Sequence, residues 1–446
     1  MKRVHNHAIR AGLIALCTVA LFCLSVVTAP AICEGPDGLI NPDCGGSGPT
    51  TNDLWWLPSS PGVWSSDFNW ALNAIGSNLS GHPTSPAGAN IGFYLHFGYA
   101  PGAANTNSTD DIASLQILGL DFGSGTNSLL IPSGSSLNIQ PTNAINPPPA
   151  TYIQVAAGGT AFIDVQGTLS ANLSNGTVGA DIGINNSGVF NVNSNMSIPS
   201  IQGDSTGTLN LNANLTVGSN NTSTTFGGGI QGTGSFTKVG TGTLNLTGDS
   251  GFSGGVIVNA GTLLVNNPIS ATGSGDVTVN SGATIGGTGN VGNLNIFTGA
   301  TLAPGNSTGV FSVGGHLDIA GTLAIQLGGT TPGQYDQVVV GFGATLFNAT
   351  LSLSLVNGFT PTFGQQFVIV QNNSPTSFGS PLFPITGSFS NGSTVMDDQG
   401  DLYAITILQT AIILTDITQP IPEPATWLLL GFGAAGSVVG RLRRRR

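Results

Sequence analysis

Aliphatic and polar residues alternate in short runs over most of the chain, and glycine separates many of these runs. Typical runs are Leu244–Leu246, Leu263–Val265, Leu323–Leu327 and Leu351–Leu355. Successive side chains of a β-strand point to opposite faces, so each run would bury its aliphatic residues and expose Asn, Thr and Ser. No apolar stripe with helical spacing lies between the runs. The pattern predicts an all-β protein made of many short strands.

A glycine–threonine motif recurs near the start of the runs. It reads Gly-Thr-Leu or Gly-Ala-Thr-(Leu/Ile) and begins at Gly167, Gly207, Gly242, Gly261, Gly282, Gly299, Gly321 and Gly343. From Thr243 to Thr345, successive motif threonines are 17 to 23 residues apart. This period favours a right-handed parallel β-helix, a solenoid in which each turn stacks on the previous one about 4.8 Å away. A string of β-sandwiches is the alternative, although its strands would come at shorter, hairpin-marked intervals.

One turn of a solenoid cannot bury its aliphatic face alone, so the rod needs a cap at each end. Residues 32–140 are predicted to form the N-terminal cap and first turns, and they contain Trp55, Trp56, Trp64 and Trp70. These rings would close the open end or form a carbohydrate-stacking platform. Residues 141–335 form the β-helix repeats, 336–408 the last turns and the C-terminal cap, and 409–421 a linker.

The N-terminal residues 1–31 are typical of a secretory signal peptide. Lys2, Arg3 and Arg10 precede the apolar segment Ala11–Val27, which would be helical, and small residues follow it. A lipoprotein anchored at Cys33 is the alternative, although Pro30-Ala31-Ile32 is a poor recognition sequence for it. After cleavage the chain keeps Cys33 and Cys44, a candidate disulfide in an oxidising compartment.

The C-terminal residues 422–446 combine three features: the tripeptide Pro422-Glu423-Pro424, an apolar run over 425–440, and a basic end. The basic residues are Arg441, Arg443, Arg444, Arg445 and Arg446. A cationic end stays cytoplasmic, so the run is predicted to be a single transmembrane helix with an arginine stop. Sixteen helical residues reach about 24 Å, short of a hydrocarbon core of about 30 Å, which favours a temporary stop. An ordinary membrane anchor is the alternative.

Charge is sparse and acidic between these ends. Residues 33–420 contain 19 acidic residues and one lysine, Lys238, so the net charge is 1 − 19 = −18. Such a chain disfavours binding to nucleic acid or anionic lipid.

Candidate chemistry in the same region is weak. The adjacent acidic pairs Asp110-Asp111 and Asp397-Asp398 lie in turn-like contexts, and His82, His96 and His316 have no metal-site spacing. Asp397, Asp398 and Asp401 could bind calcium weakly, and a solvated turn is the simpler interpretation. No catalytic residue, metal or cofactor is therefore predicted, although carboxylates far apart in sequence could still meet in space.

The C-terminal tail, with Pro422, Glu423, Pro424, the apolar run and the arginines, resembles the PEP-CTERM sorting domain. The resemblance implies processing by an exosortase-type membrane enzyme, transient anchoring in the inner membrane, and then release or attachment outside the cell. It also implies a Gram-negative bacterium that makes exopolysaccharide.

Residues 228–267 resemble the autotransporter-associated β-strand repeat, with Lys238 at the position of that repeat's lysine. Trp64 to Trp70 and Thr301–Ser307 are similar to stretches that accompany it. The resemblance implies a β-helical passenger of an exported surface protein. It also makes a repeat position, rather than a catalytic base, the simpler role for Lys238.

Together these features predict an exported, exosortase-processed, non-enzymatic β-helical protein of the cell surface or extracellular polysaccharide matrix, structural or adhesive. Its expected partners are the processing enzyme, the inner membrane and extracellular polysaccharide. A β-helical polysaccharide hydrolase or lyase is the alternative.

Overall fold

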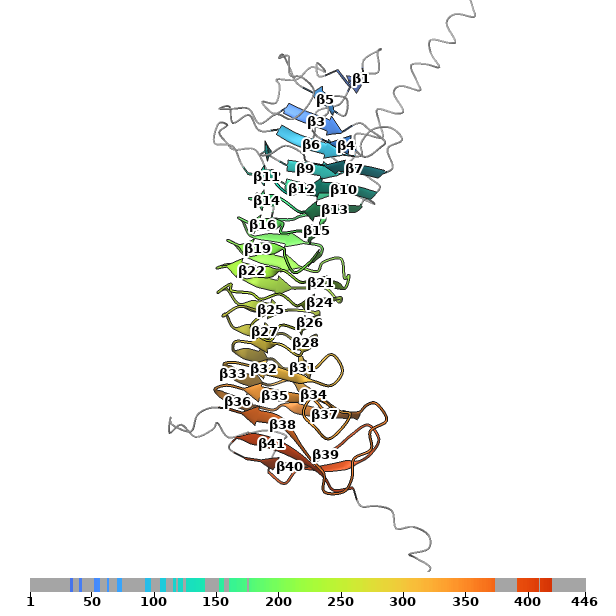
Figure 1. Cartoon of the computed structure of the whole chain (residues 1–446), viewed down its shortest axis with the longest axis vertical. Coiled ribbons are helices and arrows are strands. Elements are labelled where there is room, and N and C mark those ends of the chain that lie inside the picture. The colour runs from blue at the N-terminus through green and yellow to red at the C-terminus, as the bar shows by residue number, and fades with distance from the viewer. Residues whose placement is uncertain are drawn as a thin grey trace, which may run out of the picture.

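The computed structural model describes residues 126–140, 152–155, 160–174, 176–373, 391–408 and 410–418, together with Ile117, Gly119, Leu120 and Phe122. For the strands before residue 126 it otherwise gives the backbone alone. All regular secondary-structure elements assigned within the described residues are β-strands. These strands stack into an elongated rod whose long axis follows the sequence (Figure 1).

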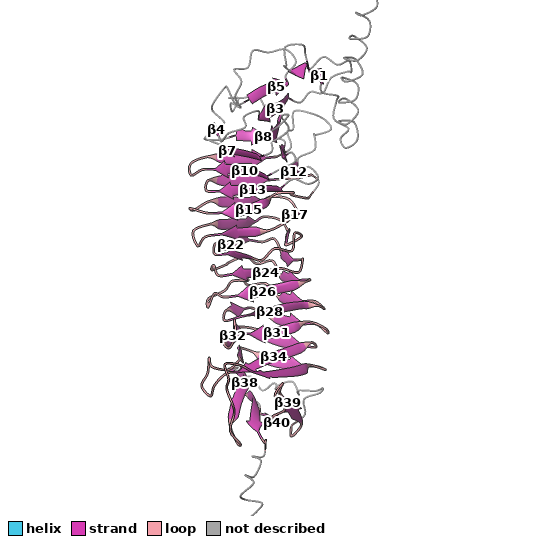
Figure 2. Cartoon of the chain, turned by 90° about the vertical axis from the view of Figure 1, so that its right-hand side faces the viewer, coloured by secondary structure: helices cyan, strands magenta, loops and turns pink. Residues whose placement is uncertain are grey.

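Three faces make up the rod, and the chain visits them in the order I, II, III before it starts the next turn. Face I is one 13-stranded sheet, and its neighbouring strands are parallel. Figure 2 shows many of its strands stacked in one column. Face I contains β4 (Gly62–Val63), β7 (Asn105–Thr109), β10 (Thr126–Ile131), β13 (Thr160–Val165), β15 (Asp181–Ile184), β18 (Ile201–Gly203), β21 (Thr224–Phe226), β24 (Thr243–Leu246), β26 (Gly261–Val265), β28 (Ala283–Gly287), β31 (Thr301–Pro304), β34 (Thr322–Leu327) and β37 (Thr350–Leu355).

Face II contains two sheets in succession along the rod. Between them, backbone hydrogen bonds such as Gly251 N–H to Ile230 O continue the stacking without assigned strands. The first sheet contains β8 (Leu115–Ile117), β11 (Ser136–Ile139), β14 (Thr168–Ala171), β16 (Val189–Val192), β19 (Thr208–Leu211) and β22 (Gly229–Gly232); the second begins with β29 (Asn290–Val291), β32 (Val310–Val313), β35 (Gln337–Val340) and β38 (Gln366–Asn372).

Face III also contains two sheets, which are joined by the parallel bridges Ile153–Val178 and Thr177–Ser197. The first contains β5 (Trp70–Asn73), β3 (Asn52–Trp56), β6 (Phe93–Phe97), β9 (Gly119–Phe122) and β12 (Tyr152–Val155); the second contains β17 (Met196–Ile198), β20 (Leu215–Val217), β23 (Phe236–Lys238), β25 (Val256–Val258), β27 (Val277–Val279), β30 (Leu294–Ile296), β33 (His316–Ile319) and β36 (Gly343–Leu346).

One continuous hydrophobic core fills the space between the faces, and it reaches from Ile117 to Leu414. On face I, Leu244, Leu263, Ile285 and Leu302 pair in register from turn to turn and are buried. The alternating runs therefore place their aliphatic residues in columns along the rod axis. The predicted parallel β-helix is confirmed, and the right-handedness of its coil stays a prediction.

Antiparallel strands occur at both ends of the rod. Near the N-terminus β5 pairs antiparallel with β3. At the other end, β38 pairs with β41 (Ala411–Asp416), which pairs with β40 (Leu402–Ile407), which pairs with β39 (Thr394–Met396). This meander caps the rod. Its strand β41 pairs with the outer edge of β38, so no further parallel turn can stack on that edge. It includes β41, which lies within residues 409–421, the range predicted as a linker.

The recurring motif does not mark the same face in every turn. Thr168 and Thr208 lie on face II, the threonines from Thr243 to Thr322 lie on face I, and Thr345 lies on face III. Thr350, which has no motif glycine, takes the place next to Thr322 on face I. Turn lengths vary, so equal spacing in the sequence does not guarantee equal position in the rod.

Two motif glycines are needed for different reasons. At Gly242 a side-chain Cβ would collide with the carbonyl oxygen of Thr222 in the preceding turn. At Gly282 the φ angle is +83°, but the space for a Cβ is open. Asparagine tolerates positive φ, as Asn186, Asn221 and Asn348 do in this chain.

We therefore expect Gly242→Ala to lower the free energy of unfolding by about 1–3 kcal/mol, because the two turns must move apart. Gly282→Asn should cost less than about 1 kcal/mol. Denaturant unfolding followed by far-ultraviolet circular dichroism measures both. Equal stability of the two variants would contradict the close-approach explanation at Gly242.

Candidate functional surface

A row of threonine side chains runs along the outside of face I. Residue pairing places Thr243, Thr262, Thr284, Thr301, Thr322 and Thr350 next to one another, one in each turn. None of their hydroxyls forms a hydrogen bond with a described residue, and the side chains are half-buried or exposed. Neighbouring turns of a parallel sheet are about 4.8 Å apart. The outer surface therefore presents hydroxyl groups at a regular spacing.

Asparagine side chains join successive turns at other positions of the surface. Asn210 donates to Asn191 at 2.8 Å, Asn266 donates to Asn245 at 2.7 Å, and Asn280 donates to Asn259 at 2.7 Å. Each such amide uses part of its bonding capacity within the protein. These rows stabilise the stacking and are less available to a ligand than the threonines.

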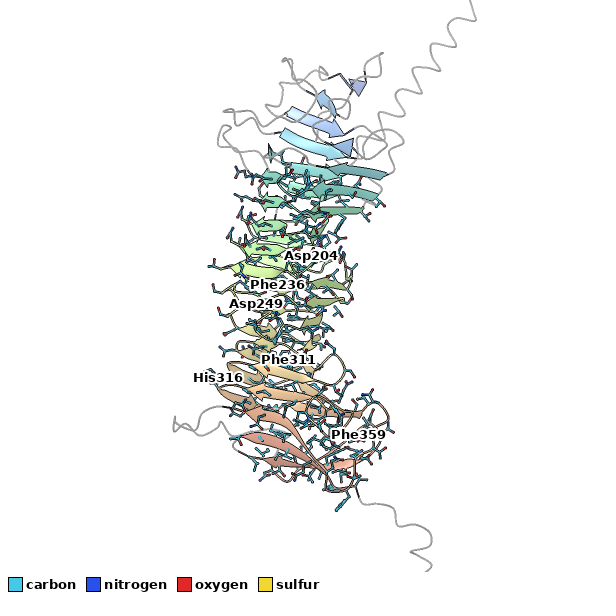
Figure 3. All side chains as sticks on the ribbon, viewed as in Figure 1. Asp204, Phe236, Asp249, Phe311, His316 and Phe359 are labelled. Carbon is cyan, nitrogen blue, oxygen red and sulfur yellow. The ribbon has the colours of Figure 1, made fainter. Side chains whose placement is uncertain are left out.

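Most described carboxylates accept hydrogen bonds from polar neighbours. Asp164 accepts from Gln166 and Asn185, and Asp181 accepts from Ser200 and Asn220. A hydrogen bond from the Thr206 hydroxyl is the main cause of the lowered pKa of Asp204. Figure 3 shows Asp204 well separated along the rod from His316. These aspartates act as hydrogen-bond acceptors, and the donors Asn185, Ser200 and Asn220 lie one or two turns away.

The C-terminal cap places the carboxylates of Asp397, Asp401 and Asp416 near one another. Asp397 accepts the backbone N–H groups of Gln399 and Asp401 and, at 2.9 Å, the hydroxyl of Tyr403. Burial, followed by the negative charges of Asp397 and Asp416, raises the pKa of Asp401. Burial also raises the pKa of Tyr403 well above its ordinary value. Asp397 thus holds a turn together.

Asp398 attaches the same turn to the rod, because its carboxylate accepts the backbone N–H of Leu355 at 2.9 Å. In the part of the chain that the structure describes, no three His, Cys, Asp or Glu side chains are grouped so as to hold a metal ion. The weak calcium site considered from the sequence at Asp397, Asp398 and Asp401 has no such arrangement.

Asp336 is a buried carboxylate at the junction between the last turns, where 1% of its surface is exposed. Its two oxygens accept the backbone N–H groups of Gly309 at 2.9 Å and Gln326 at 2.8 Å. Burial raises the pKa of Asp336 to about 7, although both hydrogen bonds favour the charged form. The sequence did not predict the burial of Asp336, because a lone aspartate after Tyr335 has no local signal of burial.

Lys238 is also buried, with 2% of its surface exposed. Its aliphatic stem lies in the face III column between Val217 and Val258, with which it pairs in register. The ammonium group donates to the carbonyl oxygens of Val239 at 2.9 Å, Gly240 at 3.0 Å and Ala260 at 3.2 Å. Burial lowers the pKa of Lys238. Three donors meet three acceptors from two turns, so the lysine ties a corner of the rod.

The sorting and disulfide residues predicted from the sequence lie outside the residues whose side chains the structure describes. They are Pro422, Glu423, Pro424, Arg441, Arg443, Arg444, Arg445, Arg446, Cys33 and Cys44. Cys33 belongs to β1 (Cys33–Glu34), whose backbone pairs antiparallel with β2 (Ile40–Asn41). A search of the described residues finds no helix with the length and apolar character needed to cross a membrane.

Comparison with known proteins matches two segments of the chain to families. Residues 236–265 match the passenger-associated-transport-repeat, and residues 420–445 match the PEP-CTERM protein-sorting motif. The chain carries both motifs. The first covers Lys238 and the turn that it ties, and the second covers the tripeptide and the arginines.

The chain is also similar to the adhesin BmaC autotransporter of Brucella suis biovar 1 (strain 1330). The two are 35% identical over 192 residues, which covers 33% of this chain and 5% of the relative. The chain thus spans a small part of the length of the curated relative that it matches. These findings, with the parallel stacking, confirm both resemblances and describe an exported surface protein with autotransporter-type repeats.

We expect Lys238→Met to lower the free energy of unfolding by about 1–3 kcal/mol, because three buried carbonyl groups lose their donor while the stem is kept. Thermal unfolding measures the change. Thr237→Val, at the outward-facing neighbour, is the matched control and should be close to neutral. If Lys238→Met unfolded at the same temperature as the parent, the role of the ammonium group would be contradicted.

The raised pKa of Asp336 predicts a pH dependence of stability. The folded protein binds this proton more tightly than the unfolded chain, so the free energy of unfolding should fall as pH rises from about 4 to 7. Asp336→Asn should remove this contribution, and its stability relative to the parent should rise by roughly 2–4 kcal/mol across that window.

Denaturant unfolding at pH 4, 5.5 and 7 measures the effect of Asp336, with Asp318→Asn on the exposed surface as control. A constant difference between Asp336→Asn and the parent at all three pH values would contradict the assignment.

Proposed function

We propose that this chain is an exported, exosortase-processed, non-enzymatic β-helical protein of the cell surface or extracellular polysaccharide matrix, with a structural or adhesive role. The observation that carries the proposal is the combination of a PEP-CTERM sorting motif at residues 420–445 with a passenger repeat at 236–265 inside one continuous rod. The similar protein from Brucella suis is named an adhesin, which agrees with an adhesive role.

The surface of the rod supports a non-enzymatic role. Several of its described aspartates are engaged in hydrogen bonds with backbone and side-chain donors. Its one lysine is buried and donates to three carbonyl groups, so it is not available as a general base. By contrast, the outer face presents rows of hydroxyl and amide groups that suit many weak contacts with an extended polymer.

The tail is proposed to act before the rod reaches its final place. The signal peptide would direct the chain across the inner membrane, and the apolar run with its arginine end would hold it there. Processing at or near Pro422-Glu423-Pro424 would then free the rod. The expected partner in this step is an exosortase-type enzyme, and neither nucleic acid nor anionic lipid is an expected partner.

Replacement of Pro422, Glu423 and Pro424 by alanine tests this processing. In a bacterium that has an exosortase, we expect the parent chain to lose an epitope placed after Arg446 and to leave the inner membrane. The triple variant should keep the epitope and stay in the membrane fraction, because the processing site is gone. Immunoblots of the cell fractions measure this, with Gln419→Ala as the matched control.

A parent chain that keeps its C-terminal epitope would contradict the proposed sorting. Equal processing of the triple variant and the control would contradict the role of the tripeptide. Adhesion to exopolysaccharide-coated surfaces, compared between cells with and without the chain, tests the adhesive role separately.

A further inference from the structure

Several large apolar side chains are exposed on the last parallel turns. Phe297 is 51% exposed, Phe342 is 62% exposed and Phe347 is 59% exposed. All three flank strands of face III, at the ends of β30 and β36. Exposed aromatic groups on a soluble surface commonly mark an interaction site.

Two of these rings lie in one row along the edge of face III. Phe297 follows Ile296, Ala320 follows Ile319, and Phe347 follows Leu346 in three successive turns. Backbone hydrogen bonds from Ala320 N–H to Ile296 O and from Phe347 N–H to Ile319 O hold them in register. The two aromatic residues are therefore two turns apart, about 10 Å, with the alanine methyl group between them.

Polar side chains form the next row inward on the same outer face. Asn295, Asp318 and Thr345 pair in register, one in each of the same three turns. None of these three side chains forms a hydrogen bond with a described residue, so their donors and acceptors face solvent.

His316 and Phe342 border the other side of this polar row. The His316 imidazole lies against the Phe342 ring, with ring centroids 6.0 Å apart and planes tilted by 36°. Gly343, the residue after Phe342, pairs with His316 in register. Figure 3 shows His316 at the outer edge of the rod. Aromatic rings thus border a central row of free polar groups on both sides.

We infer that this surface, the aromatic–polar face formed by Phe297, Phe347, Phe342, His316 and the row Asn295–Asp318–Thr345, binds a neutral polysaccharide. A pyranose ring has a flat face of C–H groups that packs on an aromatic ring, and a rim of hydroxyls that needs both donors and acceptors. The inference deepens the proposed function and rests on it, because it places the polymer contact of the exported rod.

Charge argues for this occupant over two others. The rod has one basic residue between Arg10 and Arg441, the buried Lys238, so an anionic polymer would meet Asp318 without a compensating lysine or arginine. A second copy of the chain packed symmetrically on this face would bring two Asp318 carboxylates together. A neutral glycan can instead donate its hydroxyls to Asp318.

Native affinity electrophoresis of the full chain in mild detergent tests the inference. The gels contain mixed-linkage β-glucan, galactomannan or xylan, with alginate as the charged comparison. We expect at least one neutral polymer to retard the parent, and Phe297→Ala/Phe347→Ala to weaken the affinity at least tenfold. Phe363→Ala is the matched control, because Phe363 is 58% exposed but lies outside this face.

Four results would overturn the inference. They are no retardation by any of the neutral polymers, stronger retardation by alginate, equal affinities of the double variant and the Phe363 control, or a dimer that the double variant dissociates in gel filtration. Circular dichroism spectra verify that the variants are folded. If the chain is exported and promotes adhesion while its retardation fails, the binding face is wrong and the proposed function stands. If the chain is not exported, the proposed function fails by itself.

Discussion

Hydrogen bonding between successive turns is the constraint on which the structure depends. In a parallel solenoid, each backbone N–H and C=O finds its partner about one turn away in the sequence, and an unpaired buried group is costly. This requirement sets how closely turns approach, and it explains why Gly242 cannot carry a side chain beside Thr222. It also explains the asparagine rows, since an amide on one turn reaches the amide on the next. The inward aliphatic columns follow from the same register.

Some buried polar side chains bond to backbone groups at the corners and junctions of the rod. Lys238 satisfies carbonyl groups at a corner, and Asp336 satisfies N–H groups where two long turns meet. Asp397 does the same in the cap, with Tyr403 as an additional donor. Each supplies side-chain bonds to backbone groups. The cost of burying a charged group is offset by these bonds, which is the balance expected for polar groups in a protein interior.

The same architecture shapes what the protein can do. A repeating turn presents a side chain of the same kind at nearly equal intervals, so the outer faces of the described turns carry rows of groups. Rows suit extended polymers, because many weak contacts act together. The sorting motif and the passenger repeat agree with export of such a rod, and the face bordered by Phe297, Phe347 and Phe342 differs chemically from the hydroxyl row on face I.

The sequence alone determined the strands, their buried faces and the solenoid, because alternation and a repeat of one turn are direct consequences of strand geometry. It also contained the sorting tail, which is read from adjacent residues. Only the tertiary structure decided which face each motif occupies, since turns of unequal length place Thr345 on face III and Thr350 on face I. Only the fold, too, buried Asp336, added β41 to the cap and set Phe297 near Phe347. These relations join residues that are one or more turns apart in the sequence, so a local sequence pattern does not indicate them.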